Sequence, residues 1–421
     1  MKEQQNVPTW NGSLPPGHRR DGAGNLTIGG VRAEALARAY GTPLIAVNVA
    51  TLQESINLFR AACAPRGVRI SYASKAFICT DLVRILSGNE VGLDVCSLGE
   101  LEIAEKGGCP AERLTMHGAG KTDSELRAAL AGRVGRVIVD GLSDLSRLAS
   151  LEGAGNPISI ILRLNTDVDV ATHPHVRTVG ENAKFGFVPG EEAAAIETIC
   201  SNPALQFAGL HAHAGSQITD PSVFVNNVAA LVEASHRFSA RGLPSRTLIA
   251  GGGFGIQGDP QRPQDELDIG ATIGACGNFV LTDGTFASSA LEFEPGRSII
   301  AHAGSTIYEV LAVKKRNGGN IVVVDGGMAD NPRPMLYGAY HHVVPVAERD
   351  TEHCMTNVFG RACESDFIAQ ALLPTDLARG DLLLVCTTGA YTYSMSSNYN
   401  GFPKPAVAAV LDGEHTRWAA A

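Results

Sequence analysis

Residues that could carry out chemistry follow several of the β-strands predicted from this sequence. Lys75 lies in the stretch "SYASKAF", just behind a short strand-like run, His213 ends "HAH", Glu294 opens "EPGR", and the glycine run "GGGFG" covers residues 251–255. A lysine after a strand is most often a solvent-exposed strand end. A chemical role for Lys75 therefore depends on which other groups lie beside it.

Pyridoxal 5'-phosphate (PLP) is the cofactor whose requirements this set of residues meets best. Its aldehyde forms a Schiff base with a primary amine, and a lysine desolvated at the mouth of an apolar barrel would be the neutral nucleophile. Lys75 is the candidate. The phosphate requires backbone N–H groups that can be approached closely, which glycine permits. The candidates for this contact are Gly253, Gly255, Gly296 and Ser216.

The ring of this cofactor makes two further demands on a site. Its nitrogen must stay protonated if the ring is to accept electrons, and this calls for a carboxylate such as Glu294. A salt bridge between Glu294 and Arg297 is the alternative interpretation. The flat ring also needs a side chain to stack on, and His213 is the candidate, although a lone histidine is more often a core residue with its hydrogen bonds satisfied.

Eight short apolar segments alternate with segments of helical period, as expected of βα units around a parallel sheet. A closed (β/α)8 TIM barrel has eight strands, and its chemistry lies at their C-terminal ends. Lys75, His213 and Glu294 would then meet at one mouth. The predicted strands are residues 69–75, 92–95, 114–117, 136–140, 158–164, 207–213, 247–252 and 291–296.

The rest of the chain predicts a second domain. After about residue 303, strands separated by turn residues, with little helix, predict a mostly antiparallel β-sandwich or barrel. The early strand "PLIAVNV" is surplus to the eight and can join that domain. We divide the chain into an N-terminal arm and segment packing with the β domain (1–42), a PLP-binding barrel (43–303) and a C-terminal β domain (304–421).

Composition narrows the classes of function. The 421 residues are 44% hydrophobic and 18% charged, as in ordinary globular proteins, without an apolar run long enough to span a membrane. The net charge of -9 disfavours a broad nucleic-acid surface. Nine cysteines without a CxxC pair indicate reduced thiols, and the N-terminus does not look like a secretory signal. We expect a cytoplasmic metabolic enzyme without membrane or nucleic-acid partners.

From about residue 25 to residue 406 the sequence resembles the fold-type III PLP decarboxylases. The resemblance is carried by an ordered series of motifs: "YASKA", "HGAGK", "NAKFG", "GLHAHAGSQ", "GGGFG", "EPGRS", "VDGGMADNPRPMLYGAYH", "CES" and "GAYTYSMSSNYN". It implies an alanine racemase-like barrel with a β domain, PLP as cofactor, a small-molecule amino-acid substrate and a homodimer with shared active sites.

The resemblance also implies roles for individual residues. Lys75 would hold the cofactor, His213 would stack on its ring, and Glu294 would meet its nitrogen. Cys363 would return a proton to the α-carbon after CO₂ leaves. Cys363 and Glu364 would serve the neighbouring subunit's site. The implied substrate contacts are Arg297, Arg333, Tyr337, Glu364 and Tyr391, with Tyr391 also near the cofactor.

The arginines among these contacts favour meso-2,6-diaminopimelate as substrate. Its far end carries an ammonium and a carboxylate, whereas lysine or ornithine offers only a cation there. The predicted reaction yields L-lysine and CO₂, the last step of lysine biosynthesis. A sister decarboxylase acting on a D-amino acid, carboxynorspermidine or a carrier-bound amino acid stays open, because "HGAGK" replaces the usual "HGNxK" and "CESDF" replaces the common "CESGD".

Two rivals from other classes stay open at this point. A metal-dependent barrel hydrolase would use the pair His211 and His213, completed by His117, His173 or Asp140. In such hydrolases the HxH pair usually lies on the first strand, whereas here it falls on about the sixth. A non-catalytic PLP-binding barrel would lack the β domain and the "CES" and "GAY" segments.

Overall fold

The computed structural model describes residues 14–151, 157–166, 184–262, 266–287, 290–316 and 318–418. The chain divides into two units. One consists of residues 58–255 and 266–296, and the other of residues 1–57, 256–265 and 297–421. The boundaries that we predicted at residues 43 and 303 therefore differ from those between the units. We describe each unit by itself.

The first unit is a closed parallel barrel of eight strands among the described residues, as predicted. Each predicted segment supplies one strand because each is a short apolar or β-branched run followed by a helical segment. The strands are β5 (Arg69–Ala73), β6 (Gly92–Val95), β7 (Leu114–Met116), β8 (Arg136–Val139), β9 (Ile158–Arg163), β10 (Leu205–His211), β11 (Thr247–Ile249) and β12 (Leu291–Phe293). Their order around the barrel is β10-β11-β12-β5-β6-β7-β8-β9.

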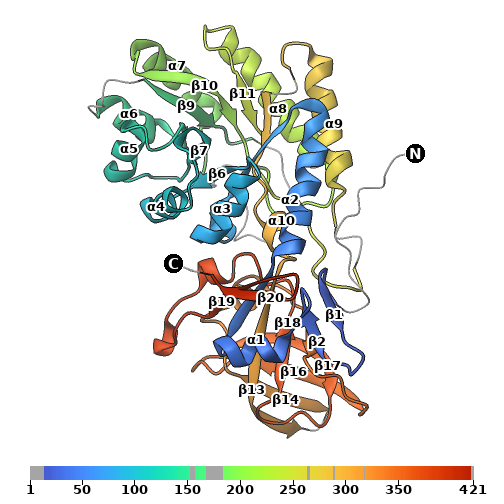
Figure 1. Cartoon of the computed structure of the whole chain (residues 1–421). Coiled ribbons are helices and arrows are strands. Elements are labelled where there is room, and N and C mark those ends of the chain that lie inside the picture. The colour runs from blue at the N-terminus through green and yellow to red at the C-terminus, as the bar shows by residue number, and fades with distance from the viewer. Residues whose placement is uncertain are drawn as a thin grey trace. The chain divides into compact units, whose positions relative to one another are not determined.

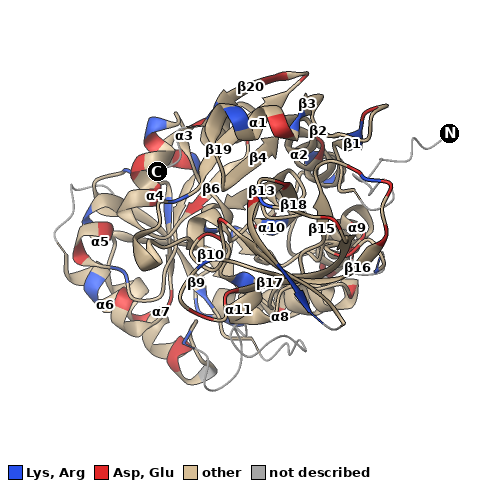
Figure 2. Cartoon of the chain, turned by 90° about the horizontal axis from the view of Figure 1, so that it is seen from below, with Lys and Arg blue, Asp and Glu red and all other residues tan. Residues whose placement is uncertain are grey.

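Helices follow the strands and lie around the outside of the barrel (Figure 1). They are α3 (Thr80–Gly88), α4 (Leu98–Lys106), α5 (Asp123–Leu130), α6 (Leu142–Ser150), α7 (Glu192–Ser201), α8 (Pro221–Ser239) and α9 (Ile269–Asp283), and α2 (Val49–Cys63) precedes β5. Figure 2 shows acidic and basic residues interspersed over α4, α5 and α6. Such mixing is usual for the solvent-facing side of helices that cover a barrel.

Local capping signals fix where these helices begin. The Ser97 hydroxyl accepts the Glu100 backbone N–H at 3.2 Å and caps the start of α4. The Glu100 carboxylate, however, accepts the N–H of Cys96 at 2.6 Å rather than that of Ser97. The pair therefore orders one more residue before the helix than the usual capping box does.

The second unit is built on a mixed sheet of nine strands within the part of the chain that the structure describes. The path through it is β17 (Phe367–Pro374), β16 (His353–Phe359), β14 (Gly319–Val324), β13 (Gly304–Arg316), β4 (Leu44–Asn48), β19 (Ala406–Leu411) and β20 (Glu414–Arg417). Off this path, β18 (Leu382–Val385) pairs with β13, and β15 (Val343–Pro345) pairs with β18. The early strand β4 thus lies between β13 and β19. The β4–β19 and β14–β16 pairs are parallel, so the sheet is less uniformly antiparallel than we predicted.

Smaller elements complete this unit, and apolar side chains fill both units. The elements are β1 (His18–Arg20), β2 (Leu26–Ile28), β3 (Val31–Arg32), α1 (Ala33–Tyr40), α10 (Arg297–Ile300) and α11 (Arg333–Tyr337). Ile138, Ile161 and Ile249 form a buried cluster in the barrel unit. Among the described residues we find no helix whose length and apolar character would let it cross a bilayer.

Candidate active site

Lys75 lies just past the C-terminal end of β5. It occupies a single 3-10 turn, Ser74–Ala76, in which Ser74 and Ala76 are buried and Lys75 is exposed. We had predicted a lysine desolvated by apolar surroundings. The structure places it instead outside the buried neighbours of the turn, so its amine is accessible to a ligand that enters the mouth.

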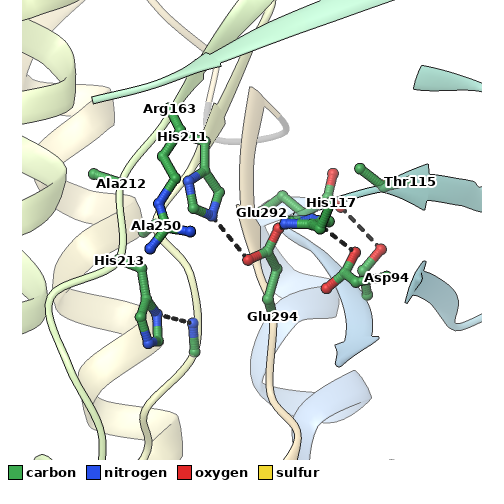
Figure 3. Close-up of polar contacts among 12 residues, drawn as sticks. Asp94, Thr115, His117, Arg163, His211, Ala212, His213, Ala250, Glu292 and Glu294 are labelled. Atoms are coloured by element: carbon green, nitrogen blue, oxygen red, sulfur yellow. Dashed lines mark hydrogen bonds and ion pairs between the residues drawn. The ribbon is translucent and has the colours of Figure 1, made fainter. Parts of the chain in front are cut away.

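Glu294 follows β12 and lies between two histidines at this mouth (Figure 3). His211, at the end of β10, hydrogen-bonds through Nε2 to Glu294 Oε2 at 3.0 Å. His117, which follows β7, places Nε2 3.1 Å from Glu294 Oε1 and 3.5 Å from Oδ1 of Asp94 on β6. All four side chains are at most 9% exposed. The alternative pairing of Glu294 with Arg297 is not what these contacts show.

Burial and mutual charge set the protonation of this cluster. Burial alone would raise the pKa of Glu294, but the histidines on either side hold it well below its usual range. Burial and the nearby Glu294 raise the pKa of Asp94 to about 7. For His117, the two carboxylates outweigh burial and raise the pKa to about 9. Burial lowers the pKa of His211 to about 4. Glu294 is therefore a carboxylate flanked by one charged and one neutral imidazole.

One oxygen of Glu294 still needs a hydrogen-bond donor. Among the described residues, buried Glu294 Oε1 has no hydrogen-bond partner, because the contact with His117 is an ion pair without hydrogen-bond direction. A buried acceptor left in this state is costly unless a donor arrives. A protonated ring nitrogen is such a donor, so the site fits the predicted contact between Glu294 and a pyridine ring.

His213 lies at the same mouth, two residues beyond the end of β10. Its Nδ1 accepts the backbone N–H of Gly252 at 3.2 Å, which places the ring proton on Nε2. Burial lowers its pKa well below the usual value, and the charge of Lys75 adds to this effect. His213 is therefore a neutral, oriented imidazole, as a stacking residue requires.

The glycine run packs tightly against the loop after β10. A Cβ at Gly253, whose φ is +99°, would lie 2.2 Å from the Gly215 carbonyl oxygen. The N–H of Gly255 donates to the Ile218 carbonyl at 2.9 Å, so it is already engaged and is not offered to a phosphate as we had predicted. Ser216 is half-buried in the same loop pair. Close backbone approach, rather than the Gly255 N–H, is what this loop provides.

Gly296 completes the part of the mouth formed by the barrel unit. It is buried, and a Cβ there would lie 3.2 Å from the side chains of Ala73 and Ala76, on either side of Lys75. The small residue is therefore required for the strand end to approach the turn that carries Lys75.

In the other unit, two arginines lie against one tyrosine. The Arg297 guanidinium lies 4.7 Å from the centre of the Tyr391 ring, and that of Arg333 lies 5.6 Å from the same ring and 5.5 Å from Tyr337. Among the described residues neither guanidinium pairs with a carboxylate, and the buried Nε of Arg297 has no hydrogen-bond partner. Burial and the charge of Arg297 lower the pKa of Arg333 to about 9. Two guanidinium groups arranged in this way could bind an anion.

Tyr391 also has an unusual backbone. Its φ is 59°, in the left-handed region that side chains other than glycine rarely adopt. Such residues cluster at ligand sites, where the surrounding structure enforces the conformation. The ring between the two arginines is therefore positioned at some conformational cost.

Cys363 and Glu364 lie on an exposed loop between β16 and β17. The Cys363 N–H donates to the Asn400 side chain at 3.0 Å, and Glu364 accepts the Tyr399 hydroxyl at 3.1 Å. Buried Asp366 accepts the N–H groups of Ala362, at 2.8 Å, and of Met328. The loop is therefore ordered by Asp366, the residue that distinguishes "CESDF" from the common motif.

Our sequence analysis singled out neither Asp94 nor Lys121, and it considered His211 only as a metal ligand. Asp94 and His211 belong to the cluster around Glu294, and Lys121 of "HGAGK" is buried, donating to Gly118 O at 2.8 Å and to Asp144 at 3.1 Å. A charged residue within a short apolar strand, as in "GLDV", was the available signal for Asp94. For Asp366, the departure of "CESDF" from the common motif was the available signal.

The metal set that we considered does not assemble as proposed. His117 and His211 do meet with Glu294, with ligand atoms within 4.8 Å of one another. His213 instead binds the Gly252 backbone, Asp140 lies 3.6 Å from Arg163, and His173 lies outside the described residues.

The fold and site define a barrel enzyme that binds PLP, and comparisons with known proteins agree. A family described as pyridoxal-dependent decarboxylase, pyridoxal binding domain, matches residues 49–301. The chain is 37% identical over 414 residues to a diaminopimelate decarboxylase of Actinosynnema pretiosum subsp. auranticum, covering 96% of this chain and 91% of the relative. It is also 37% identical over 411 residues to that of Bacillus subtilis, covering 94% and 92%.

A solved structure shares the fold. Diaminopimelate decarboxylase from M. jannaschii in complex with L-lysine aligns with a TM-score of 0.86 at 27% identity, covering 95% of this chain and 94% of that one. This chain belongs to the pyridoxal-dependent decarboxylase family, and its cofactor is PLP.

Proposed function

We propose that this chain decarboxylates meso-2,6-diaminopimelate to L-lysine and CO₂. The relatives that cover nearly the whole chain carry the name of this activity. The observation that carries the proposal is the pair Arg297 and Arg333, two half-buried cations without a carboxylate partner among the described residues. A decarboxylase for a simple diamine precursor has no need of such a pair.

The distal end of the substrate explains the two arginines. In diaminopimelate it carries a carboxylate that guanidinium groups can bind through paired hydrogen bonds. Lysine and ornithine would bring only an ammonium group to two uncompensated cations, which costs desolvation energy and adds repulsion. The lowered pKa of Arg333, about 9, indicates how poorly its charge is compensated before an anion binds.

Residues of the barrel unit would bind the cofactor and hold its protons. Lys75 would be the amine for its aldehyde, Glu294 Oε1 would accept the ring N–H, and neutral His213 would stack on the ring. The backbone around Gly253 and Gly296, with Ser216, would receive the phosphate. When bound, PLP supplies an electron-accepting ring that allows CO₂ to leave the α-carbon.

Cys363 would return the proton to the α-carbon. The thiol lies on an exposed loop of its own chain, whereas a general acid works best where water is excluded. We therefore include a homodimer in the proposal, in which Cys363 and Glu364 serve the partner subunit's cofactor. Tyr337 and Tyr391 would orient the substrate beside the arginines.

The experiment is CO₂ release from meso-diaminopimelate beside L-lysine, D-lysine and L-ornithine, with PLP supplied. We expect turnover of diaminopimelate alone. Arg333→Gln should lower kcat/KM by roughly 10²- to 10³-fold, since one partner of a buried charge pair is lost, while PLP affinity changes little. Arg349→Gln, which removes an arginine paired with Asp381 in the same unit, is the matched control.

Other outcomes of this experiment would change the substrate that we assign to the enzyme. Turnover of a D-amino acid, carboxynorspermidine or a carrier-bound amino acid would keep the reaction type and transfer the chain to a sister activity. An equal loss of PLP affinity and turnover in Arg333→Gln would remove the arginine pair from the substrate site.

A further inference from the structure

His117 lies where two buried carboxylates approach each other. Its Nε2 is 3.1 Å from Glu294 Oε1 and 3.5 Å from Asp94 Oδ1, and its backbone N–H donates to Val95 O at 2.7 Å. The imidazole therefore extends from the end of β7 between residues carried by β6 and by the segment after β12 (Figure 3). None of the roles described so far accounts for His117 or Asp94.

We propose that His117 is a positioning residue for the cofactor, and that Asp94 holds a proton on it so that Glu294 stays ionised and available to the ring nitrogen. The proposal rests on the proposed contact between Glu294 and the cofactor. It assigns the charge balance of the site to His117, which contacts Glu294, and to Asp94, which contacts His117.

Counting charges explains why a second carboxylate is present. Glu294 alone could balance one cation, the protonated ring nitrogen. Because His117 is charged as well, two cations would face a single anion in a buried site, which is costly. Asp94 supplies the second anion, and the site becomes neutral only when His117 and the ring nitrogen both carry protons.

The charges of the protein without bound cofactor are consistent with this charge balance. Two carboxylates then share one imidazolium, and the excess negative charge adds to burial in raising the pKa of Asp94 to about 7. In addition, neither oxygen of Asp94 has a hydrogen-bond partner among the described residues, although the side chain is only 4% exposed. The contact that Asp94 makes in this cluster is the ion pair of its Oδ1 with His117 Nε2 at 3.5 Å.

The other histidine cannot replace His117. His211 donates to Glu294 Oε2 at 3.0 Å, but burial and the charge of Arg163 keep it neutral. It orients the carboxylate without compensating its charge.

The titratable and charged groups whose fields reach this cluster are Lys75, Asp94, Glu100, Arg136, Arg163, His211, His213, Glu292 and Glu294.

The first test needs neither cofactor nor turnover. In the apoprotein labelled with ¹⁵N-histidine, NMR should show His117 doubly protonated at pH 7.5 and His211 neutral. Asp94→Asn should lower the His117 pKa by roughly one unit or more, because an adjacent anion is lost. Asp144→Asn is the matched control, since Asp144 is a buried aspartate of the same unit that pairs with Lys121, and it should leave the His117 titration unchanged.

The second test measures PLP affinity by fluorescence quenching. Asp94→Asn and His117→Gln should each weaken binding roughly ten- to hundredfold, as expected when a buried charged contact is lost, whereas Asp144→Asn should not. His236→Asn, which removes a histidine paired with Asp283 on the barrel helices, is the control for His117→Gln. Circular dichroism checks that each variant is folded.

Each unexpected result would contradict a different part of the proposal. A neutral His117 in the wild-type apoprotein at pH 7.5 would overturn the proposal even if no variant folds. Normal PLP affinity in both Asp94→Asn and His117→Gln, beside weakened binding in Glu294→Gln, would overturn the positioning role alone. Normal affinity in Glu294→Gln would overturn the cofactor contact itself, and the positioning role with it.

Discussion

The residues at the mouth of the barrel and the loop that carries Cys363 differ in burial and in what holds them in place. Asp94, His211 and Glu294 come from three strands of one barrel and are at most 7% exposed. Cys363 and Glu364 are exposed and depend on a few contacts from Asp366, Asn400 and Tyr399. The groups assigned to the cofactor are thus fixed by sheet register. The group assigned to proton return lies on a loop and needs further burial to act as an acid.

The largest expected effect concerns the loop. Cys363→Ala should lower kcat by about 10²- to 10⁴-fold, the usual contribution of a general acid, and leave PLP affinity and the cofactor's visible absorbance unchanged. Steady-state kinetics beside a PLP titration measure both quantities. A parallel loss of PLP binding would mean that the two regions are not separate in function.

A heterodimer of two different variants tests whether Lys75 and Cys363 of one site come from different chains. Lys75→Ala and Cys363→Ala, co-expressed with different affinity tags and purified through both, form heterodimers. If each site takes Lys75 from one chain and Cys363 from the other, one of the two sites is intact and about half of the wild-type activity returns. If both residues serve the same chain's site, both sites are defective and the heterodimer is inactive.

An intermediate effect on kcat is expected from Asp366, whose carboxylate holds the loop that carries Cys363. Asp366→Ala removes the acceptor of two partly buried backbone N–H groups, and the loss of each bond costs at most about 1–3 kcal/mol. We expect kcat to fall roughly tenfold by misplacement of Cys363, with a lower denaturation midpoint and unchanged PLP affinity. Asp376→Ala, at a surface pair with Arg349, is the control. Unchanged kcat would show that Asp366 stabilises the unit without positioning the acid.

The smallest expected effect is a pH dependence at the barrel mouth. The pKa of His117 is raised from 6.5 to about 9, so its contribution to stability is complete below pH 6.5 and is lost as the pH rises through 9. Denaturant unfolding of the apoprotein should therefore show a stability difference between wild type and His117→Gln that shrinks over this range, by at most about 3 kcal/mol. A constant difference would contradict the raised pKa.

The barrel was predictable from the sequence because each of its strands and helices has a recognisable local sequence pattern. Each strand is a short, mostly apolar run, and Lys75, His213 and Glu294 come within two residues of the end of such a run. Chemistry at strand ends then follows from the architecture alone. The family resemblance added the residues of the other unit, which no periodicity marks.

What could not be predicted depends on contacts between distant segments. The engagement of the Gly255 N–H by Ile218, and of Met328 by Asp366, requires knowledge of which loops lie side by side. The exposure of Lys75 depends on one turn after β5. Likewise, Asp94 is an ordinary strand residue until the register places it beside His117.

The position of β4 at the centre of its sheet has a consequence for synthesis on the ribosome. This strand is buried along its whole length between β13 and β19, yet β13 follows it by roughly 250 residues. At about 5–20 residues per second, the nascent chain carries this apolar strand unpaired for roughly ten to fifty seconds. Residues 58–255 are translated during that interval, so a chaperone that covers Leu44–Asn48 would act in the window before its partners emerge.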